Sequence, residues 1–475
     1  MQDHLQTFLA VARNENSDEN GLPSFVEREF TRYLECGILA HGFVRVHCDD
    51  CGHDRLVAFS CRGRAICPSC NTRRMFDTAA HRVDRVLPSG PTYRQWALSL
   101  PRWVRFRLAY QPKIVSRVLQ IFVRAIFACQ RRRARRRGIR DGQPGSVTFV
   151  QRFGSALNLN VHFHVLAPDG VFSEHAGEIS FVALGSPTDD EVEAVLRKVA
   201  RRTLALMERA DESPSSVLDG SADPYAGAFK ESLQGVARSA IDELPVQRRR
   251  RAAYLQGFSV HANVSVGENK RDALERLCRY GARPPIALGR LSSTGNGRIV
   301  YRVKHHAPGE SGVLVLTPLE LLGKLSALIP PPRTHGVRYH GVFAPNARWR
   351  SRVVPTARPV PEALDEAGPG AVMERILACM PPRPRRLDWA ALLLRVFKID
   401  VLACDQCGGR MRVLAFLTDP DVTRGILAHL ELSTAAPSVK PARAPPRLRT
   451  EGVDAELFDP ASDQDGVDPL PADDA

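Results

Sequence analysis

Two kinds of hydrophobic pattern alternate in the middle of the chain. Apolar and polar residues take turns in four short segments, 147–153, 157–165, 258–266 and 299–303, and a period of two predicts strands. Apolar residues recur with helical spacing at 190–209 and 270–280, which predicts helices between the strands. The middle of the chain is therefore expected to be α+β.

Helical patterns also precede this region. The segment 112–137 has apolar residues at helical spacing and ends in a run of arginines from Arg131 to Arg137, interrupted by Ala134. This predicts an amphipathic helix with a basic C-terminal end. A shorter helical pattern, at 25–39, leads into a cysteine-rich stretch. From Ser433 onward no periodicity remains, and a disordered tail is expected that ends rich in aspartate.

Four cysteines mark the cysteine-rich stretch, in the spacing Cys48-x2-Cys51-x15-Cys67-x2-Cys70. Two such pairs can present four thiolates tetrahedrally to one ion, so the spacing predicts a structural Zn²⁺ site in a small module. Buried thiols without metal are the alternative. Three neighbours could substitute for a ligand: His47, His53 and Cys61.

A second cysteine pair, Cys404 and Cys407, stands near the end of the chain without a matching downstream pair. It indicates a metal only weakly. Around the first cysteines stand Arg64, Arg73 and Arg74, which would suit contacts to phosphates but could equally be ordinary surface.

Two histidines share one face of the second predicted strand. Between 157 and 165 the odd positions are apolar, whereas His162 and His164 stand at even positions. A strand turns both imidazoles to the same side, one pleat apart, and this arrangement can chelate a divalent cation. Two histidines on a solvated strand face are the alternative. His261, on the polar face of the next strand, is a candidate third ligand if the strands are neighbours, and otherwise a histidine without a metal.

The charge balance favours an anionic partner. The formal net charge is +14, and the last segment, 451–475, holds nine acidic residues and no basic one, so the rest of the chain is more basic still. Nucleic acid would match this charge. The alternative is compositional, because only eight of the 66 basic residues are lysines and abundant arginine is also typical of GC-rich genomes. Candidate DNA contacts are Arg64, Arg73, Arg74, Arg131, Arg132 and Arg133.

Compartment can also be read from the sequence. No apolar run approaches the roughly 20 residues that span a bilayer, and the first twenty residues lack the regions of a signal peptide. Eleven cysteines in 475 residues are too sparse for a disulfide scaffold. We therefore expect a cytoplasmic protein without membrane contact.

Four blocks of the sequence resemble the insertion-sequence-91 transposases and the related common-region elements, which are members of the HUH endonuclease superfamily. The blocks are CGILAHGFVRVHCDDCGHDRLVAFSCRGRAICPSC, LNLNVHFHVLAPDGVF, LERLCRYGARPPIALGRLS and VFKIDVLACDQCGGRMRVLAFLTDP. The resemblance covers most of 22–430. It implies a central antiparallel sheet flanked by helices, with the histidine pair on a central strand and a nucleophilic tyrosine on a nearby helix.

For this chain the resemblance identifies Tyr280 as the nucleophile. It implies that His162 and His164 hold Mg²⁺ or Mn²⁺ and that Tyr280 cuts one DNA strand, leaving a 5′-phosphotyrosine and a free 3′-hydroxyl. The DNA would be the single-stranded ends of a mobile element and its target, in rolling-circle transposition. Rejoining needs no ATP, and the absence of a G-x-x-x-x-G-K-[ST] motif agrees with an enzyme that uses no nucleotide cofactor.

One position departs from part of that family. Members with two catalytic tyrosines have them four residues apart, and Arg276 occupies the other position here, so the chain looks like a single-tyrosine variant. An ordinary tyrosine packed at a helix end is the alternative for Tyr280. Tyr301 shares an apolar strand face with Ile299 and Val303, which favours core packing.

The expected organisation has five parts. They are a zinc-binding domain (1–80), a helical basic connector (81–145), an HUH catalytic domain (146–345), a C-terminal region with the second cysteine pair (346–432) and a disordered tail (433–475). A plasmid relaxase or replication initiator would use the same chemistry, but the zinc module favours a transposase. A catalytically inactive, zinc-dependent DNA-binding protein is the alternative from another class.

Overall fold

A computed structural model describes residues 1–15, 21–211, 244–303, 312–355, 400 and 402–443. Its largest sheet comprises β3 (Tyr93–Ser99), β4 (Gly145–Phe153), β5 (Leu159–Pro168), β8 (Gln247–Arg249), β9 (Ala252–Leu255), β10 (Phe258–His261), β11 (Ser265–Val266) and β15 (Val337–Gly341). The order is β15-β4-β5-β3-β10-β9-β8, with β11 also on β3, and every pairing is antiparallel. The expected central antiparallel sheet is confirmed.

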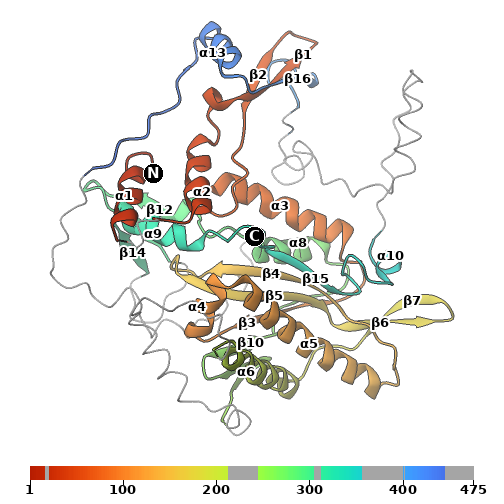
Figure 1. Cartoon of the computed structure of the whole chain (residues 1–475). Coiled ribbons are helices and arrows are strands. Elements are labelled where there is room, and N and C mark those ends of the chain that lie inside the picture. The colour runs from red at the N-terminus through yellow and green to blue at the C-terminus, as the bar shows by residue number, and fades with distance from the viewer. Residues whose placement is uncertain (16–20, 212–243, 304–311, 356–399, 401, 444–475) are drawn as a thin grey trace.

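Helices cover both faces of this sheet (Figure 1). One face is covered by α4 (Arg102–Tyr110), α5 (Pro112–Arg136) and α6 (Asp189–Asp211), and the other by α3 (Pro68–Arg85) and α8 (Arg271–Gly281). Separate hydrophobic clusters fill the two interfaces, with Phe163 in the first and Phe149 in the second. The helices predicted at 112–137, 190–209 and 270–280 are confirmed.

The central strand β3 has no counterpart among the predicted strands. All seven of its residues are buried, because β5 and β10 flank it and helices cover both faces, so no polar alternation marks it. Its Arg94 donates to both carboxylate oxygens of Asp169 at 2.7–3.0 Å, to the Ala262 carbonyl at 2.7 Å and to the Ser186 hydroxyl at 2.6 Å. This buried ion pair ties β3 to the segments that follow β5 and β10.

A three-stranded sheet forms a separate unit, which we call the cysteine module. It consists of β1 (Phe43–Cys48), β2 (Asp54–Ala58) and β16 (Met411–Leu417), with β1 in the middle. Beside it lie η1 (Leu39–His41) and α13 (Pro420–His429) (Figure 1). The helix α2 (Ser24–Glu35) packs elsewhere, because its buried Val26 and Phe30 share a hydrophobic cluster with Leu5. The prediction of a separate region at 346–432 needs correction for residues 402–432. Because β16 pairs with β1 from Met411 to Leu417, with one irregularity in the register, this strand belongs to the cysteine module.

A third hydrophobic cluster joins the N-terminal helix to a second small sheet. It contains residues of α1 (Leu5–Glu15), α9 (Pro318–Leu328), β13 (Ile299–Arg302) and β14 (Val313–Leu316). The remaining elements are β6 (Gly170–His175), β7 (Glu178–Ala183), η3 (Leu288–Arg290), β12 (Leu291–Ser293) and α10 (Arg350–Val353). Tyr301 is buried in this cluster at 2 % exposure, which confirms its assignment to the core.

The C-terminal segment returns to the start of the chain. Residues 433–443 contain no helix or strand, as predicted, yet the Lys440 amide donates to the Gln2 carbonyl at 3.1 Å and the Arg443 amide to the Thr7 hydroxyl at 3.0 Å. The rest of the predicted tail, 444–475, lies outside the described residues. Among the described helices, none is both long and apolar enough to cross a membrane.

Candidate functional site

The histidine pair lies on β5, near the middle of the large sheet. Val161, Phe163 and Val165 pack into the cluster beneath α4, α5 and α6, so strand alternation turns His162 and His164 toward α3 and α8. The two imidazole centroids are 4.9 Å apart, and the residues are 5 % and 1 % exposed. The structure thus brings the two imidazoles together, on a face that is buried and not solvated.

The surroundings of His164 suit a ligand for a cation. Neither of its ring nitrogens has a hydrogen-bond partner among the described residues. Burial, together with His162 and the positive charge of Arg283, lowers the pKa of His164 well below its usual value, so the imidazole is neutral and keeps a lone pair for a metal. A buried polar group without a partner costs about 1–3 kcal/mol, and a bound ion would remove that cost.

Tyr280 lies at the C-terminal end of α8, beside the histidines. Its ring centroid is 5.5 Å from that of His164. The side-chain amide of Gln151, on β4, donates to the carbonyls of Tyr280 at 2.9 Å and Gly281 at 3.0 Å, which satisfies two helix-end acceptors. A Cβ atom on Gly281 would lie 2.6 Å from Phe149. The helix end can therefore approach β4 this closely only because residue 281 is glycine.

Arg283 adds a positive charge at the same place. Its guanidinium carbon lies 4.7 Å from the Tyr280 ring centroid and 5.5 Å from that of Phe153, within cation–π range. Neither Arg283 nor Gln151 is among the site residues predicted from the sequence. Arg283 stands three residues after Tyr280, within the block LERLCRYGARPP. Its position in this block was the one indication in the sequence that it belongs to the site.

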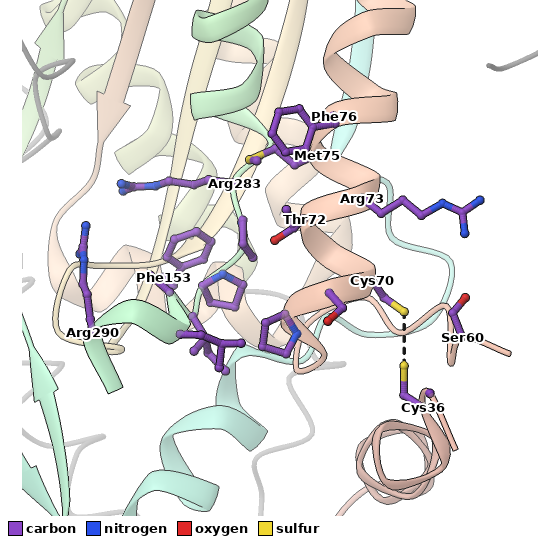
Figure 2. Close-up of a pocket in the computed structure, with 18 of the residues that line it drawn as sticks. Cys36, Ser60, Cys70, Thr72, Arg73, Met75, Phe76, Phe153, Arg283 and Arg290 are labelled. Atoms are coloured by element: carbon purple, nitrogen blue, oxygen red, sulfur yellow. Dashed lines mark hydrogen bonds between the residues drawn. The ribbon is translucent and has the colours of Figure 1, made fainter. Parts of the chain in front are cut away.

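A cavity of about 760 Å³ adjoins Arg283, between the large sheet and the segments that carry Cys36 and Cys70 (Figure 2). Phe153, Arg283 and Arg290 line it from the side of the sheet. The volume falls within the range of about 300–1,000 Å³ typical of ligand sites. An aromatic ring with arginines beside it is suited to stacking and charge contacts with a nucleotide.

Three of the predicted DNA contacts lie near this cavity. Arg73 lines it, but Figure 2 shows its side chain directed away from Arg283. Arg74 donates to the carbonyl of Arg62 at 2.8 Å, and Arg64 donates to the carbonyl of Thr334 at 3.2 Å. Arg64 and Arg74 therefore already stabilise the fold, and Arg73 is the most available of the three to a ligand.

The other three predicted contacts, Arg131, Arg132 and Arg133, lie at the end of α5. That helix covers the sheet face opposite to the histidines. Arg133 donates to the carbonyls of three successive residues, 184–186, at 2.8–3.0 Å and pairs with Glu191 at 3.3 Å. Arg133 is thus occupied within the protein, and DNA contact by Arg131 and Arg132 stays a prediction.

The prediction of His261 as a third ligand depended on neighbouring strands, and this condition is not met. β3 lies between β5 and β10, and Ala97 separates His164 from His261 in the register. Two strand spacings separate the backbones by about 10 Å, so the two imidazoles would have to lean toward each other across β3 to share an ion. The His261 ring instead packs edge-on against Tyr254, with centroids 5.0 Å apart. Among the described residues, no group of three metal-binding side chains includes His162 or His164.

The four cysteines of the predicted zinc site do not lie together. Cys67 and Cys70 lie with Cys36 and Cys61, whereas Cys48 and Cys51 lie with Cys404 and Cys407. The prediction of one Zn²⁺ on Cys48, Cys51, Cys67 and Cys70 was therefore wrong. The reason is the chain topology. The hairpin of β1 and β2 carries Cys48 and Cys51 away from α3, whereas Cys67 stands at the N-terminal end of α3, beside Cys36 at the end of α2.

The group of Cys36, Cys61, Cys67 and Cys70, which we call the first cysteine group, fits a zinc ion. Its sulfur atoms are 3.5–3.8 Å apart in three of the pairs, close to the edge of about 3.8 Å of a tetrahedron with Zn–S bonds of about 2.3 Å. Of the three predicted substitutes, Cys61 belongs to this group. The other two have different partners, as His47 contacts Asp54 at 2.8 Å and His53 contacts Asp405 at 3.3 Å.

Two family models match separate parts of the chain. Residues 2–100 match the family model described as "Transposase zinc-binding domain", and residues 145–351 match the one described as "Putative transposase". The second match contains both histidines and Tyr280. No solved structure matches the chain.

Two curated relatives are similar over most of the chain. The "Transposase for insertion sequence element IS801" of Pseudomonas savastanoi pv. phaseolicola is 25 % identical over 83 % of this chain and 84 % of its own. The "Putative transposase y4qJ" of Sinorhizobium fredii is 23 % identical over 68 % of this chain and 76 % of its own. Because family models of transposase domains match residues 2–100 and 145–351, and the IS801 transposase is similar over 83 % of the chain, the chain belongs to the insertion-sequence-91 family of transposases.

Proposed function

We propose that this transposase cuts and rejoins single-stranded DNA through a covalent link to Tyr280, and that it thereby drives rolling-circle transposition of an insertion sequence. One observation carries the proposal. Tyr280 packs against His164, and His164 is a buried imidazole with two unpartnered nitrogens next to a second histidine. A nucleophile, a candidate cation site and the charge of Arg283 therefore share one place.

The exchange of bonds is balanced within the DNA and the tyrosine. The phenolic oxygen of Tyr280 attacks the scissile phosphorus and loses its proton to solvent. A new P–O bond forms as the bond to the 3′ oxygen breaks, and the leaving 3′ oxygen takes up a proton. Attack of a 3′-hydroxyl on the phosphotyrosine reverses the exchange. Because the number of phosphodiester bonds is conserved, the cycle consumes no ATP.

The surrounding residues would position the DNA and stabilise charge. His162 and His164 would hold Mg²⁺ or Mn²⁺, which when bound polarises the scissile phosphate. Arg283 would stabilise the negative charge of the phosphate beside Tyr280. The cavity lined by Phe153, Arg283 and Arg290 would receive a nucleotide flanking the cut, through stacking and phosphate contacts. A chromosomal DNA substrate would place the protein in the cytoplasm.

Two other functions make different predictions. A plasmid relaxase or replication initiator shares the chemistry, but the family comparisons favour a transposase. An inactive zinc-dependent DNA-binding protein would bind the element's ends without cutting them. The test is incubation of the full-length protein with labelled single-stranded DNA from the element's own ends and Mn²⁺, followed by a denaturing gel that retains covalent adducts.

Two variants with a matched control locate the chemistry. Tyr280→Phe keeps the ring and its packing against His164, so it should bind DNA and form no adduct. Tyr254→Phe, on β9, should form the adduct as the wild type does. His162→Ala should abolish metal-dependent nicking and largely keep DNA binding, because affinity comes mainly from arginines on phosphates. Full adduct formation by Tyr280→Phe, or a nucleotide-linked peptide that spans Tyr254 or Tyr301, would refute the assignment.

The number of adducts is a further test of the single-tyrosine interpretation. Arg276 is exposed on α8 in the position of a second tyrosine, so this helix should carry at most one nucleotide link per chain. Mass spectrometry of the trapped complex measures this number directly.

A further inference from the structure

We propose that Cys48, Cys51, Cys404 and Cys407 bind a second Zn²⁺ ion, which fastens residues 402–417 to the N-terminal part of the cysteine module. The four sulfur atoms all lie within 4.8 Å of one another. Cys48 and Cys407 are 3.5 Å apart and Cys51 and Cys404 are 3.6 Å apart. These separations are near the edge of about 3.8 Å of a tetrahedral Zn–thiolate site and well above the roughly 2.05 Å of a disulfide.

The two halves of this site have the same local structure. Each is a Cys-Asp-x-Cys-Gly loop, at 48–52 and at 404–408. The Gly52 amide donates to the Cys48 carbonyl at 2.9 Å, and the Gly408 amide donates to the Cys404 carbonyl at 2.8 Å. Both glycines have positive φ, +72° and +77°, the conformation that such tight turns require of glycine. Two equivalent knuckles thus offer two thiolates each.

The environment of the cysteines gives a physical reason for a metal here. Among the described residues, the hydrophobic cluster between the two halves has four buried members, with Val44 and Val57 partly buried against it: Val46, Cys48, Cys404 and Met411. So small a core is insufficient to order a small unit without a metal or disulfide. A structural zinc ion supplies this folding free energy in small modules.

Further contacts align the two halves around the sulfur atoms. Arg412 pairs with Asp49 at 2.7 Å, and Arg55 pairs with Asp405 at 2.7 Å. The aspartate of each cysteine loop therefore forms an ion pair with an arginine that follows the other loop in the sequence. Gly409 lies so close to Asp50 that a Cβ atom would overlap its carboxylate, at 2.0 Å. The knuckles are therefore packed directly against each other and not merely near one another.

This site shares no residue with the first cysteine group, so the two ions can be counted separately. Native mass spectrometry of the full-length protein should find about two zinc ions per chain. Cys404→Ser/Cys407→Ser should retain about one, and Cys61→Ser/Cys67→Ser should also retain about one. Cys129→Ala, a buried cysteine of α5 outside both groups, should keep two and serves as the control.

A second measurement tests the fastening. Hydrogen exchange should accelerate in residues 43–48 and 411–417 of Cys404→Ser/Cys407→Ser and stay unchanged in 93–99, at the centre of the large sheet. If the double variant fails to fold, the single variant Cys407→Ser replaces an exposed side chain and should still lose one ion. One zinc per chain in the wild type, or two in Cys404→Ser/Cys407→Ser, would overturn the proposal.

Discussion

Replacing Arg94 with methionine should destabilise the large sheet by about 3–5 kcal/mol, the usual cost of removing one partner from a buried ion pair. Arg94 and Asp169 are 1 % and 6 % exposed. In the variant the Asp169 carboxylate loses its donors from Arg94, at 2.7–3.0 Å, and stays buried. The Ala262 carbonyl and the Ser186 hydroxyl lose a donor as well.

The expected change can be measured by calorimetry. For a unit of about 150–250 residues, 1 kcal/mol shifts the unfolding midpoint by about 2–4 °C, so Arg94→Met should lower the midpoint of the part that contains the large sheet by about 6–20 °C. The double variant Arg94→Met/Asp169→Asn should recover part of this loss, because a neutral amide costs less to bury than an unpaired carboxylate. A double variant no more stable than the single one would refute the reasoning.

The pH dependence of the same variant gives an independent check. Burial raises the pKa of Asp169, while the hydrogen bonds and charge of Arg94 lower it. Without Arg94 the folded-state pKa rises further above the unfolded value of about 3.9, and a carboxyl with a raised pKa destabilises the fold where it is ionised. The deficit of Arg94→Met should therefore be largest at neutral pH and shrink as the pH falls toward 4. A deficit independent of pH would contradict the assignment.

Three other predictions concern the site and its surroundings. Gly281→Ala places a Cβ atom 2.6 Å from Phe149, so it should lower the free energy of unfolding by about 1–3 kcal/mol and reduce adduct formation by Tyr280. The control Gly289→Ala, with open space around it, should change neither quantity. Equal effects in the two variants would contradict this packing. His261→Ala should leave the Mn²⁺ concentration for half-maximal nicking unchanged, since β3 separates it from the histidine pair; a large increase would restore it as a ligand. Burial and Arg338 lower the pKa of His340 from 6.5 to about 4. Because that folded-state pKa lies below the unfolded one, stability is complete above pH 6.5 and should fall by about 1–3 kcal/mol between pH 6.5 and 4. Titration of the unfolding free energy should show a flatter curve for His340→Gln, and an identical curve would exclude His340 as the cause.

The sequence was sufficient to predict the histidine strand because local geometry decides it. A period of two fixes which side chains share a face, and Val161, Phe163 and Val165 do pack opposite to His162 and His164. The predicted start of that strand was early by two residues, because Leu157 adopts a positive φ of 56° in the turn before it. Such a turn is set by contacts that alternation does not encode.

Other features depend on which segments meet in space, and the sequence does not specify this. The strand β3 is buried on both faces and has no alternation, so its insertion between β5 and β10 could not be anticipated, and His261 was expected too close to His164. The grouping of cysteines failed for a similar reason. Spacing shows which cysteines form a pair, but only the pairing of β1 with β16 brings Cys48 and Cys51 to Cys404 and Cys407.

The pairing of β1 with β16 also makes the start of the polypeptide depend on its end during synthesis. Cys407 follows Cys48 by 359 residues, so at about 5–20 residues per second the ribosome needs roughly 20–70 s to deliver the missing strand. Until then one edge of β1 is unpaired, and unpaired edges favour misassembly. A copy of the element truncated by a frameshift before residue 402 would yield a chain that never completes this sheet. With β1 unpaired on one edge and Cys48 and Cys51 without Cys404 and Cys407, such a truncated chain would be a target for proteases and would not accumulate beside the full-length protein.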